Sequence, residues 1–463
     1  MPADASPTAL LARELAGRLD PRTGVSAPAH AWGVFEQGAL VASGGSGDAE
    51  AMATRTAFRV ASCTKSFTAA SALLLADDGL LDLDEPLAEA LDVPLRLIGP
   101  TGAAPTVRDA LSMRAGLPTD DPWADRQESM SDDDFARLLG EGVRVMWTAG
   151  ERYEYSNLGY AIVGRIIALR ARMPFRRVVE TRLLEPLGLT ETGFDASVGA
   201  AGGAIAGFRA APDGWERLPF TGPGAFSPIG GLFSTVADLS RWCGILAGSI
   251  DAGDALAASV SERMRHPHIR ILGDPAGSGA WQAYGLGLVV RSDGVRRFLA
   301  HSGGYPGFSS FMTWEAGSGA GAVAFENATY AGVTAVVRDA MDAAFDSGVL
   351  PEPDAAAAEP WPETVQAAER VRATLATGTL DPDPLFDPCV ELDRPFSWRR
   401  ADLAGLIDAV GGVDRAGVLA HETPARAAWV MRGPTGAIRC SLMMTPHAEP
   451  RVQRLDVALL PDG

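Results

Sequence analysis

One short segment, Ala61-Ser62-Cys63-Thr64-Lys65, constrains this chain more than any other because it carries the only lysine among 463 residues. Apart from six histidines, every other basic side chain is an arginine. The guanidinium group of arginine stays protonated at any pH that a protein meets. A lone lysine therefore indicates a need for an amine that can lose and regain a proton. Three residues before it stands Ser62, whose hydroxyl such an amine can activate for attack on a carbonyl carbon.

The residues after Ser62 have the pattern of a buried helix. Residues 58–61 are predicted to be extended, and Ser62 then opens a helix that Gly79 ends. A spacing of three places Ser62 and Lys65 on one face, about one turn apart. For Lys65 to act as a base, its pKa must fall from about 10.4 to about 7, and burial lowers the pKa of an amine. The alternative is a capping serine beside a solvated lysine.

Charge and composition exclude several classes of function. The formal net charge is -18, so the surface repels the phosphates of nucleic acid and of anionic lipid. No run approaches the roughly 18 apolar residues of a membrane span, and residues 1–7 lack the basic start and apolar core of a secretory signal. We therefore expect a cytoplasmic protein without nucleic acid or membrane partners.

The cysteines are too scattered for a disulfide framework or a zinc site, and we predict four buried thiols at Cys63, Cys243, Cys389 and Cys440. We expect no metal ion and no organic cofactor.

The pattern of apolar and turn residues predicts an α+β domain over residues 1–350. Helices are expected at 8–20, 158–172, 235–246 and 332–345, with helical pieces and loops over 82–150 and glycine-rich and proline-rich loops over 200–230. A hairpin is expected at 31–42, and antiparallel strands at 285–291, 297–301, 309–314 and 321–326.

Proline and alanine dominate residues 351–362, which predicts a linker. Residues 363–463 then form a separate C-terminal α+β domain with a small antiparallel sheet. Its expected elements are helices at 363–376 and 398–410 and strands at 427–432, 437–444 and 452–460.

A second candidate site segment is Tyr155-Ser156-Asn157. A tyrosine before a helix can pass a proton between a serine and a leaving group, and Asn157 can orient the lysine and a substrate amide. The tripeptide alone equally fits a helix cap at Asn157 with Tyr155 in the core.

A third segment is His301-Ser302-Gly303-Gly304, at the end of a predicted strand. Its glycines allow a substrate to lie against the strand edge, and the Gly304 N–H can join that of Ser62 in binding an oxyanion. The alternative is an ordinary glycine-rich turn. Other polar residues are expected to be solvated, namely His266, His268, His447, Arg451 and Arg454, although either of these arginines could reach a substrate carboxylate.

In this order, Ser62-x-x-Lys65, Tyr155-x-Asn157 and His301-Ser302-Gly303 resemble the signature of the serine β-lactamase and penicillin-binding protein superfamily. The resemblance is to its class C-like branch, with D-aminopeptidases and esterases, and covers about residues 8–346, including segments 111–117 and 230–235. It implies an antiparallel sheet flanked by helices, an all-helical lobe, and an active site between them.

The resemblance also implies roles for the site residues. Ser62 is then the nucleophile, Lys65 the base or proton relay, Tyr155 the proton shuttle and Asn157 a contact to the substrate amide. His301 stands where β-lactamases carry the lysine of Lys-Thr-Gly. Loss of that cation and of the threonine hydroxyl predicts poor hydrolysis of penicillins.

The acceptor that removes the acyl group from Ser62 decides the function. A cytoplasmic chain with this core and a C-terminal domain is similar to the penicillin-binding-protein-type thioesterases. That similarity implies a lipocalin-like C-terminal domain, although three strands do not support a complete barrel. It also implies a peptidyl thioester ending in a D-residue, presented by a peptidyl carrier domain of a nonribosomal synthetase, and head-to-tail macrolactam closure. The alternatives are a D-amino-acid-specific peptidase or carboxylesterase and, more remotely, a non-catalytic binding module.

Overall fold

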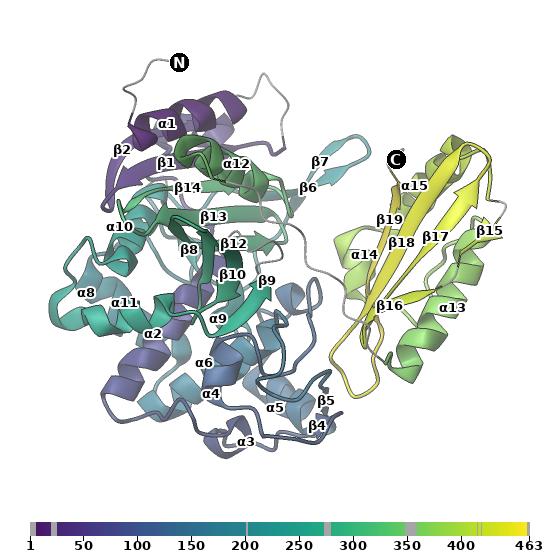
Figure 1. Cartoon of the computed structure of the whole chain (residues 1–463), viewed down its shortest axis with the longest axis horizontal. Helices are drawn as coiled ribbons and strands as arrows, with labels where there is room; N and C mark the ends of the chain where they lie inside the picture. Colours follow the sequence, from purple (N-terminus) through teal and green to yellow (C-terminus); the bar gives the residue numbers. More distant parts are fainter. Residues whose placement is uncertain are drawn as a thin grey trace.

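The computed structural model describes residues 6–19, 26–200, 202–272, 279–347, 359–413, 415–417 and 419–460. An eight-stranded antiparallel sheet is the centre of the larger unit, with the strand order β2-β1-β14-β13-β12-β11-β10-β9 (Figure 1). The strands are β1 (His30–Glu36), β2 (Ala39–Ser46), β9 (Ile269–Leu272), β10 (Ala280–Tyr284), β11 (Val289–Asp293), β12 (Arg297–Tyr305), β13 (Phe308–Glu315) and β14 (Ala320–Glu326).

Helices cover both faces of this sheet. α1 (Pro7–Arg18) and α12 (Val333–Phe345) pack together on one face, and α10 (Val236–Ala247) packs against the other (Figure 1). Every residue of β13 and β14 is buried, because a strand covered on both faces has no solvent side.

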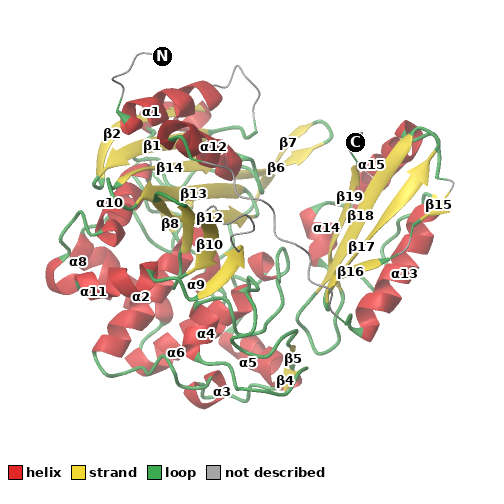
Figure 2. Cartoon of the chain, in the orientation of Figure 1, coloured by secondary structure: helices red, strands yellow, loops and turns green. Residues whose placement is uncertain are grey.

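A lobe of helices adjoins the sheet (Figure 2). At its centre lies α2 (Thr64–Asp77), buried from Thr64 to Leu75, and α6 (Asn157–Ala171) packs beside it. Most other helices of this lobe are short: α3 (Leu87–Ala90), α4 (Val107–Leu111), α5 (Asp132–Glu141), α7 (Phe175–Val179), η5 (Glu180–Leu184), α8 (Glu185–Leu187), α9 (Ser227–Gly230) and α11 (Ala258–Arg265).

The predicted α+β class is confirmed, and so are the long helices, the first hairpin and the last two strands of this unit, each to within a few residues. The predicted strand 285–291 is confirmed only over residues 289–291, which lie in β11, because residues 285–288 form the turn between β10 and β11. Part of the segment predicted as loops over 200–230 is also wrong, because β6 (Gly207–Ala211) and β7 (Gly214–Leu218) pair as a hairpin.

The C-terminal unit is a five-stranded antiparallel sheet packed with helices α13 (Pro362–Ala376), α14 (Cys389–Asp393) and α15 (Phe396–Ala409). Both longer helices and three strands were predicted, namely β17 (Arg426–Gly433), β18 (Gly436–Met444) and β19 (Val452–Leu459); β15 (Arg415–Ala416) and β16 (Ala420–Thr423) were missed. The described strands form an open sheet, in which β19 pairs with β18 alone, so a lipocalin-like barrel is not confirmed.

The linker predicted at 351–362 falls mostly outside the described residues, and its last residue begins α13. All four cysteines are free and buried, as predicted. Within the described ranges, no helix combines the length and apolarity that crossing a bilayer requires.

Candidate active site

Ser62 lies in a tight turn between strand and helix. The chain leaves β3 (Phe58–Arg59), passes through the short helix η3 (Ala61–Cys63), and enters α2. Ala61 has a φ of 46°, a left-handed conformation that costs free energy in a residue with a Cβ atom. This turn leaves Ser62 8% exposed and places it in the wall of a cavity.

Lys65 is completely buried behind Ser62. Its Nζ donates hydrogen bonds of 2.8 Å to Oγ of Ser62 and of 2.8 Å to the carbonyl oxygen of Ile229 in α9. Burial lowers the pKa of Lys65 to about 8, although the carboxylates of Asp121, Asp125 and Asp120 oppose this shift. About one molecule in ten therefore carries a neutral Lys65 amine at pH 7.

Tyr155 completes the contacts around the serine. Its hydroxyl hydrogen bonds to Ser62, and its ring centroid lies 5.1 Å from Nζ of Lys65. Burial, followed by the charge of Asp121, raises the pKa of Tyr155 well above its ordinary value. Tyr155 is therefore a protonated phenol near neutral pH, so it can donate a proton, and Lys65 is the group suited to accept one.

Asn157 is not among the residues that line the cavity at Ser62, so its contact to a substrate amide stays a prediction. It is fully buried at the start of α6, and its Nδ2 donates to Oδ1 of Asp120 at 3.0 Å and to Oδ1 of Asp121 at 2.5 Å. Ser156 caps this helix instead of Asn157, accepting from the N–H of Gly159. Asn157 thus orients two carboxylates, one of which lines the cavity.

His301 lies in the middle of β12, which continues to Tyr305 and does not end at the glycines. Its Nε2 lies 2.8 Å from the Tyr284 hydroxyl, and its Nδ1 lies 2.6 Å from the carbonyl oxygen of Ser302. Burial, together with the charge of Lys65, lowers the pKa of His301 to about 3. A neutral ring that donates from Nδ1 and accepts at Nε2 fits both contacts, so His301 does not supply the missing cation.

The two glycines after it allow close approaches to β12. A Cβ atom on Gly303 would lie 2.5 Å from the carbonyl oxygen of Val60 and 3.0 Å from Cβ of Ala61, so only a glycine lets the strand lie against the serine turn. A Cβ atom on Gly304 would lie 2.5 Å from the ring of Tyr330. Gly304 and Ser62 line the same cavity. The predicted oxyanion site, formed by their two N–H groups, requires this placement.

This catalytic cavity has a volume of about 600 Å³. Residues from both units line it: Ser62, Thr119, Asp121, Pro122, Tyr155, Ser302, Gly304 and Tyr330 from the larger unit, and Asp393, Arg454 and Asp456 from the C-terminal unit. The C-terminal unit therefore supplies one wall of the site.

Sequence reasoning missed the acidic residues of this site. Asp120, Asp121 and Asp125 stand close together in the sequence and gather beside Lys65. Burial raises the pKa of Asp120 to about 7, and Tyr330 donates a hydrogen bond to Asp125 at 2.6 Å. The signal available was an acidic run between the serine and tyrosine motifs, which without coordinates is typical of a solvated loop.

Two histidines that were predicted to be solvated are partly buried. His447 is half-buried, with its ring edge-on to Trp123 at 4.8 Å, and burial lowers the pKa of the similarly half-buried His268 to about 4. Arg454 is half-exposed, as predicted, and also lines the catalytic cavity, where it pairs with Asp456 at 2.8 Å.

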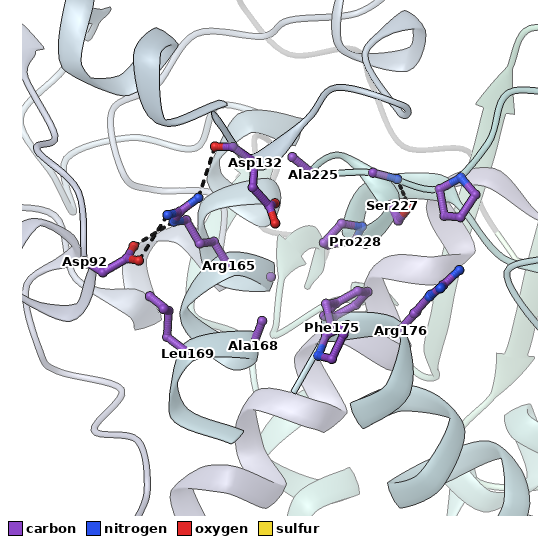
Figure 3. A pocket seen from close by; sticks show the side chains of 14 residues that line it. Asp92, Asp132, Arg165, Ala168, Leu169, Phe175, Arg176, Ala225, Ser227 and Pro228 are labelled. Carbon is purple, nitrogen blue, oxygen red and sulfur yellow. Dashed lines mark hydrogen bonds and ion pairs between the residues drawn. The ribbon is translucent and has the colours of Figure 1, made fainter. Parts of the chain in front are cut away.

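A second cavity, of about 390 Å³, lies behind α9, and Ser62 is not among the residues that line it (Figure 3). Arg165 is one of the charged residues that line it. Its guanidinium group donates hydrogen bonds to both carboxylate oxygens of Asp92, at 2.8 and 3.1 Å, and to the carbonyl oxygen of Asp132, at 3.2 Å. Pro228 of α9 lines it and also accepts a hydrogen bond from Thr68 of α2. This cavity is therefore the reverse side of the segment that holds Lys65.

Fold and site together define a serine acyl-transfer arrangement: a hydroxyl on a strained turn, a buried amine that can deprotonate it, and a phenol that can protonate a leaving group. Comparison with known proteins assigns the family. The β-lactamase family model matches residues 17–345, and the chain belongs to this family.

Among curated proteins, the chain is similar to protein Rv1367c of Mycobacterium tuberculosis, with 28% identity over 301 residues that span 56% of this chain and 73% of that protein. Among solved structures, it resembles D-amino acid amidase of Ochrobactrum anthropi SV3 in complex with L-phenylalanine amide. The TM-score is 0.57 at 25% identity, over 73% of this chain and 99% of that one.

One similar structure also spans the C-terminal unit. The octameric penicillin-binding protein homologue from Pyrococcus abyssi matches 98% of this chain and 96% of its own, with a TM-score of 0.59 and 19% identity. This likeness concerns the fold alone.

Proposed function

We propose that this protein is a serine acyl-enzyme catalyst whose nucleophile is Ser62. One observation carries the proposal: Nζ of a fully buried Lys65 lies 2.8 Å from Oγ of Ser62, which forms part of the cavity wall. The neutral amine takes the Ser62 proton as Oγ attacks a carbonyl carbon, and the carbonyl oxygen becomes an oxyanion. The leaving group then takes the proton from Lys65, directly or by relay through Tyr155, which leaves an ester on Ser62, a neutral Lys65 and a protonated Tyr155.

The finer proposal is that an amine of the same substrate attacks this ester and closes a macrolactam. It rests on the resemblance of the three motifs to the penicillin-binding-protein-type thioesterases and on the wall that the C-terminal unit adds to the cavity. The substrate is then a peptidyl thioester with a C-terminal D-residue, and its partner a peptidyl carrier domain.

Hydrolysis is the second candidate, and the similarity to a D-amino acid amidase favours it. In that case water attacks the acyl-enzyme, and the substrate is an amide or ester of a D-amino acid. The two outcomes share every step up to the ester on Ser62.

One experiment separates them. A linear peptidyl thioester ending in a D-residue is incubated with the purified protein, and the products are resolved by mass spectrometry. The cyclase proposal predicts a product lighter than the free acid by one water, whereas free acid alone from several such substrates would establish hydrolysis. No turnover, with no adduct on Ser62, would favour the non-catalytic binding module.

A further inference from the structure

The charged side chains that line the catalytic cavity differ in whether they form an ion pair with another residue. Asp121, Asp393, Asp456 and Arg454 line it, so carboxylates outnumber cations on its wall. Asp393 accepts from Arg126 at 3.1 Å and from Arg399 at 3.3 Å. Asp456 accepts from Arg454 at 2.8 Å. These two carboxylates each have an arginine partner.

Asp121 has none among the described residues. Its Oδ1 accepts one hydrogen bond, from the neutral amide of Asn157, and no hydrogen bond or ion pair of the described chain involves its Oδ2. Lys65 lies close enough to affect it, but the hydrogen bonds of Nζ go to Ser62 and to the Ile229 carbonyl oxygen. A half-buried carboxylate on a cavity wall, fixed on one oxygen and free on the other, is built to receive a cation from the cavity.

We propose that Asp121 binds a primary ammonium group of the substrate beside Ser62. This inference rests on the proposed acyl-enzyme function and deepens it, because it names a charged group that the substrate carries. The ammonium group has two possible sources: the α-ammonium group of the acyl donor, or the protonated form of the acceptor amine, which passes one proton to the Asp121 carboxylate before its lone pair attacks the ester on Ser62. Arg454, in the same wall, is near enough for its charge to act on Asp121, but its ion pair is with Asp456.

The donor experiment compares D-phenylalanine 4-nitroanilide with its N-acetyl derivative, which differs in lacking the ammonium group. Both are measured with the wild type and with Asp121→Asn, which preserves shape and an acceptor for Asn157. A charge-assisted hydrogen bond predicts that the ratio of kcat/KM values, amine over acetyl, falls about 10- to 100-fold in this variant. Asp121→Glu should restore part of the ratio. Asp393→Asn, in the same wall but paired with arginines, should leave the ratio unchanged.

The acceptor experiment uses 4-nitrophenyl acetate as an uncharged donor and measures how the acetyl-enzyme partitions between water and D-phenylalanine amide. If the acceptor supplies the ammonium group, Asp121→Asn lowers the yield of the N-acetyl amide relative to acetate, while the donor ratio stays at its wild-type value. A fall in either ratio supports the proposal and identifies the source.

One result overturns the assignment. If both ratios are unchanged in Asp121→Asn, whether or not the overall activity falls, Asp121 serves only to balance the charge around Lys65. Labelling of Ser62 by a fluorophosphonate, run on each preparation, separates this failure from that of the proposed function. Labelling with unchanged ratios removes the role of Asp121 alone, whereas a wild-type protein that does not label removes both.

Discussion

At the scale of single residues, the chemistry depends on an amine that arginine cannot replace. Lys65 is completely buried, and the carbonyl oxygen of Ile229 fixes its Nζ beside Ser62. The pairing of Lys65 with Ser62 was predictable from the sequence, because composition and helical spacing are local properties. The state of His301 was not predictable, because its low pKa follows from burial beside Lys65 in the folded chain.

Replacing the lysine tests this dependence. Lys65→Arg retains a positive charge but cannot accept a proton near neutral pH, so we expect turnover of an activated ester to fall about 10²- to 10⁴-fold. Lys65→Met, which retains the length without the amine, should fall as far. Thermal unfolding of both variants checks that the fold persists. Most of the wild-type rate in a folded Lys65→Arg protein would refute the free-amine mechanism.

The pH dependence of acylation tests the state of the same residue. Burial lowers the pKa of Lys65 to about 8, and its neutral form is the base. As the pH rises towards 8, the neutral fraction of Lys65 increases tenfold per pH unit. The rate constant for fluorophosphonate labelling should therefore rise tenfold per unit and level off above about pH 8. In Asp121→Asn the midpoint should move to lower pH, because that carboxylate raises the pKa of Lys65. A rate that is flat from pH 6 to 9 would contradict this account.

At the scale of elements, the site depends on β12 lying directly against the serine turn. The sequence predicted a strand at 297–301 and helices at 158–172 and 332–345, because their apolar patterns are periodic. It did not predict that β12 runs on through Gly303 and Gly304. Glycines are typical of turns, and only the approach of Val60 and Ala61 explains them inside a strand.

Gly303→Ala tests this packing. The added methyl would lie 2.3 Å from Oγ of Ser310 and 2.5 Å from the Val60 carbonyl oxygen, so strand and turn must separate. We expect a loss of about 1 to 3 kcal/mol in the free energy of unfolding, with a larger proportional loss of acylation. Gly332→Ala is the matched control, because a Cβ there meets nothing within 4 Å, and it should change neither quantity appreciably. Equal behaviour of the two variants would disprove the packing argument.

At the scale of the whole molecule, the C-terminal unit lines the candidate active site. Its two longer helices and three of its strands were predicted, but its contribution to the cavity was not, because contacts between distant segments leave no periodic pattern. Gln453 of β19 shows the connection: it is fully buried, accepts from the N–H of Trp123 at 3.2 Å, and donates to the carbonyl oxygen of Thr119 at 3.1 Å.

Gln453→Ala should therefore loosen the junction between the units. It removes these hydrogen bonds and leaves buried backbone groups unpaired, which costs about 1 to 3 kcal/mol. We expect a lower free energy of unfolding and faster hydrogen exchange at residues 119–123. Arg439→Ala, an exposed position in the same sheet, is the control and should stay within about 0.5 kcal/mol of the wild type. Unchanged exchange at 119–123 in Gln453→Ala would contradict a role at the junction.

The most direct test of the central claim is the identity of the residue that a fluorophosphonate modifies. The protein is incubated with a fluorophosphonate, digested, and sequenced by mass spectrometry, in parallel with Ser62→Ala and folded Lys65→Arg. We predict one adduct, on Ser62, that is absent from Ser62→Ala and formed at least about 100-fold more slowly in Lys65→Arg. An adduct at another residue, or labelling of Lys65→Arg at the wild-type rate, would show that Ser62 and Lys65 do not form the catalytic pair.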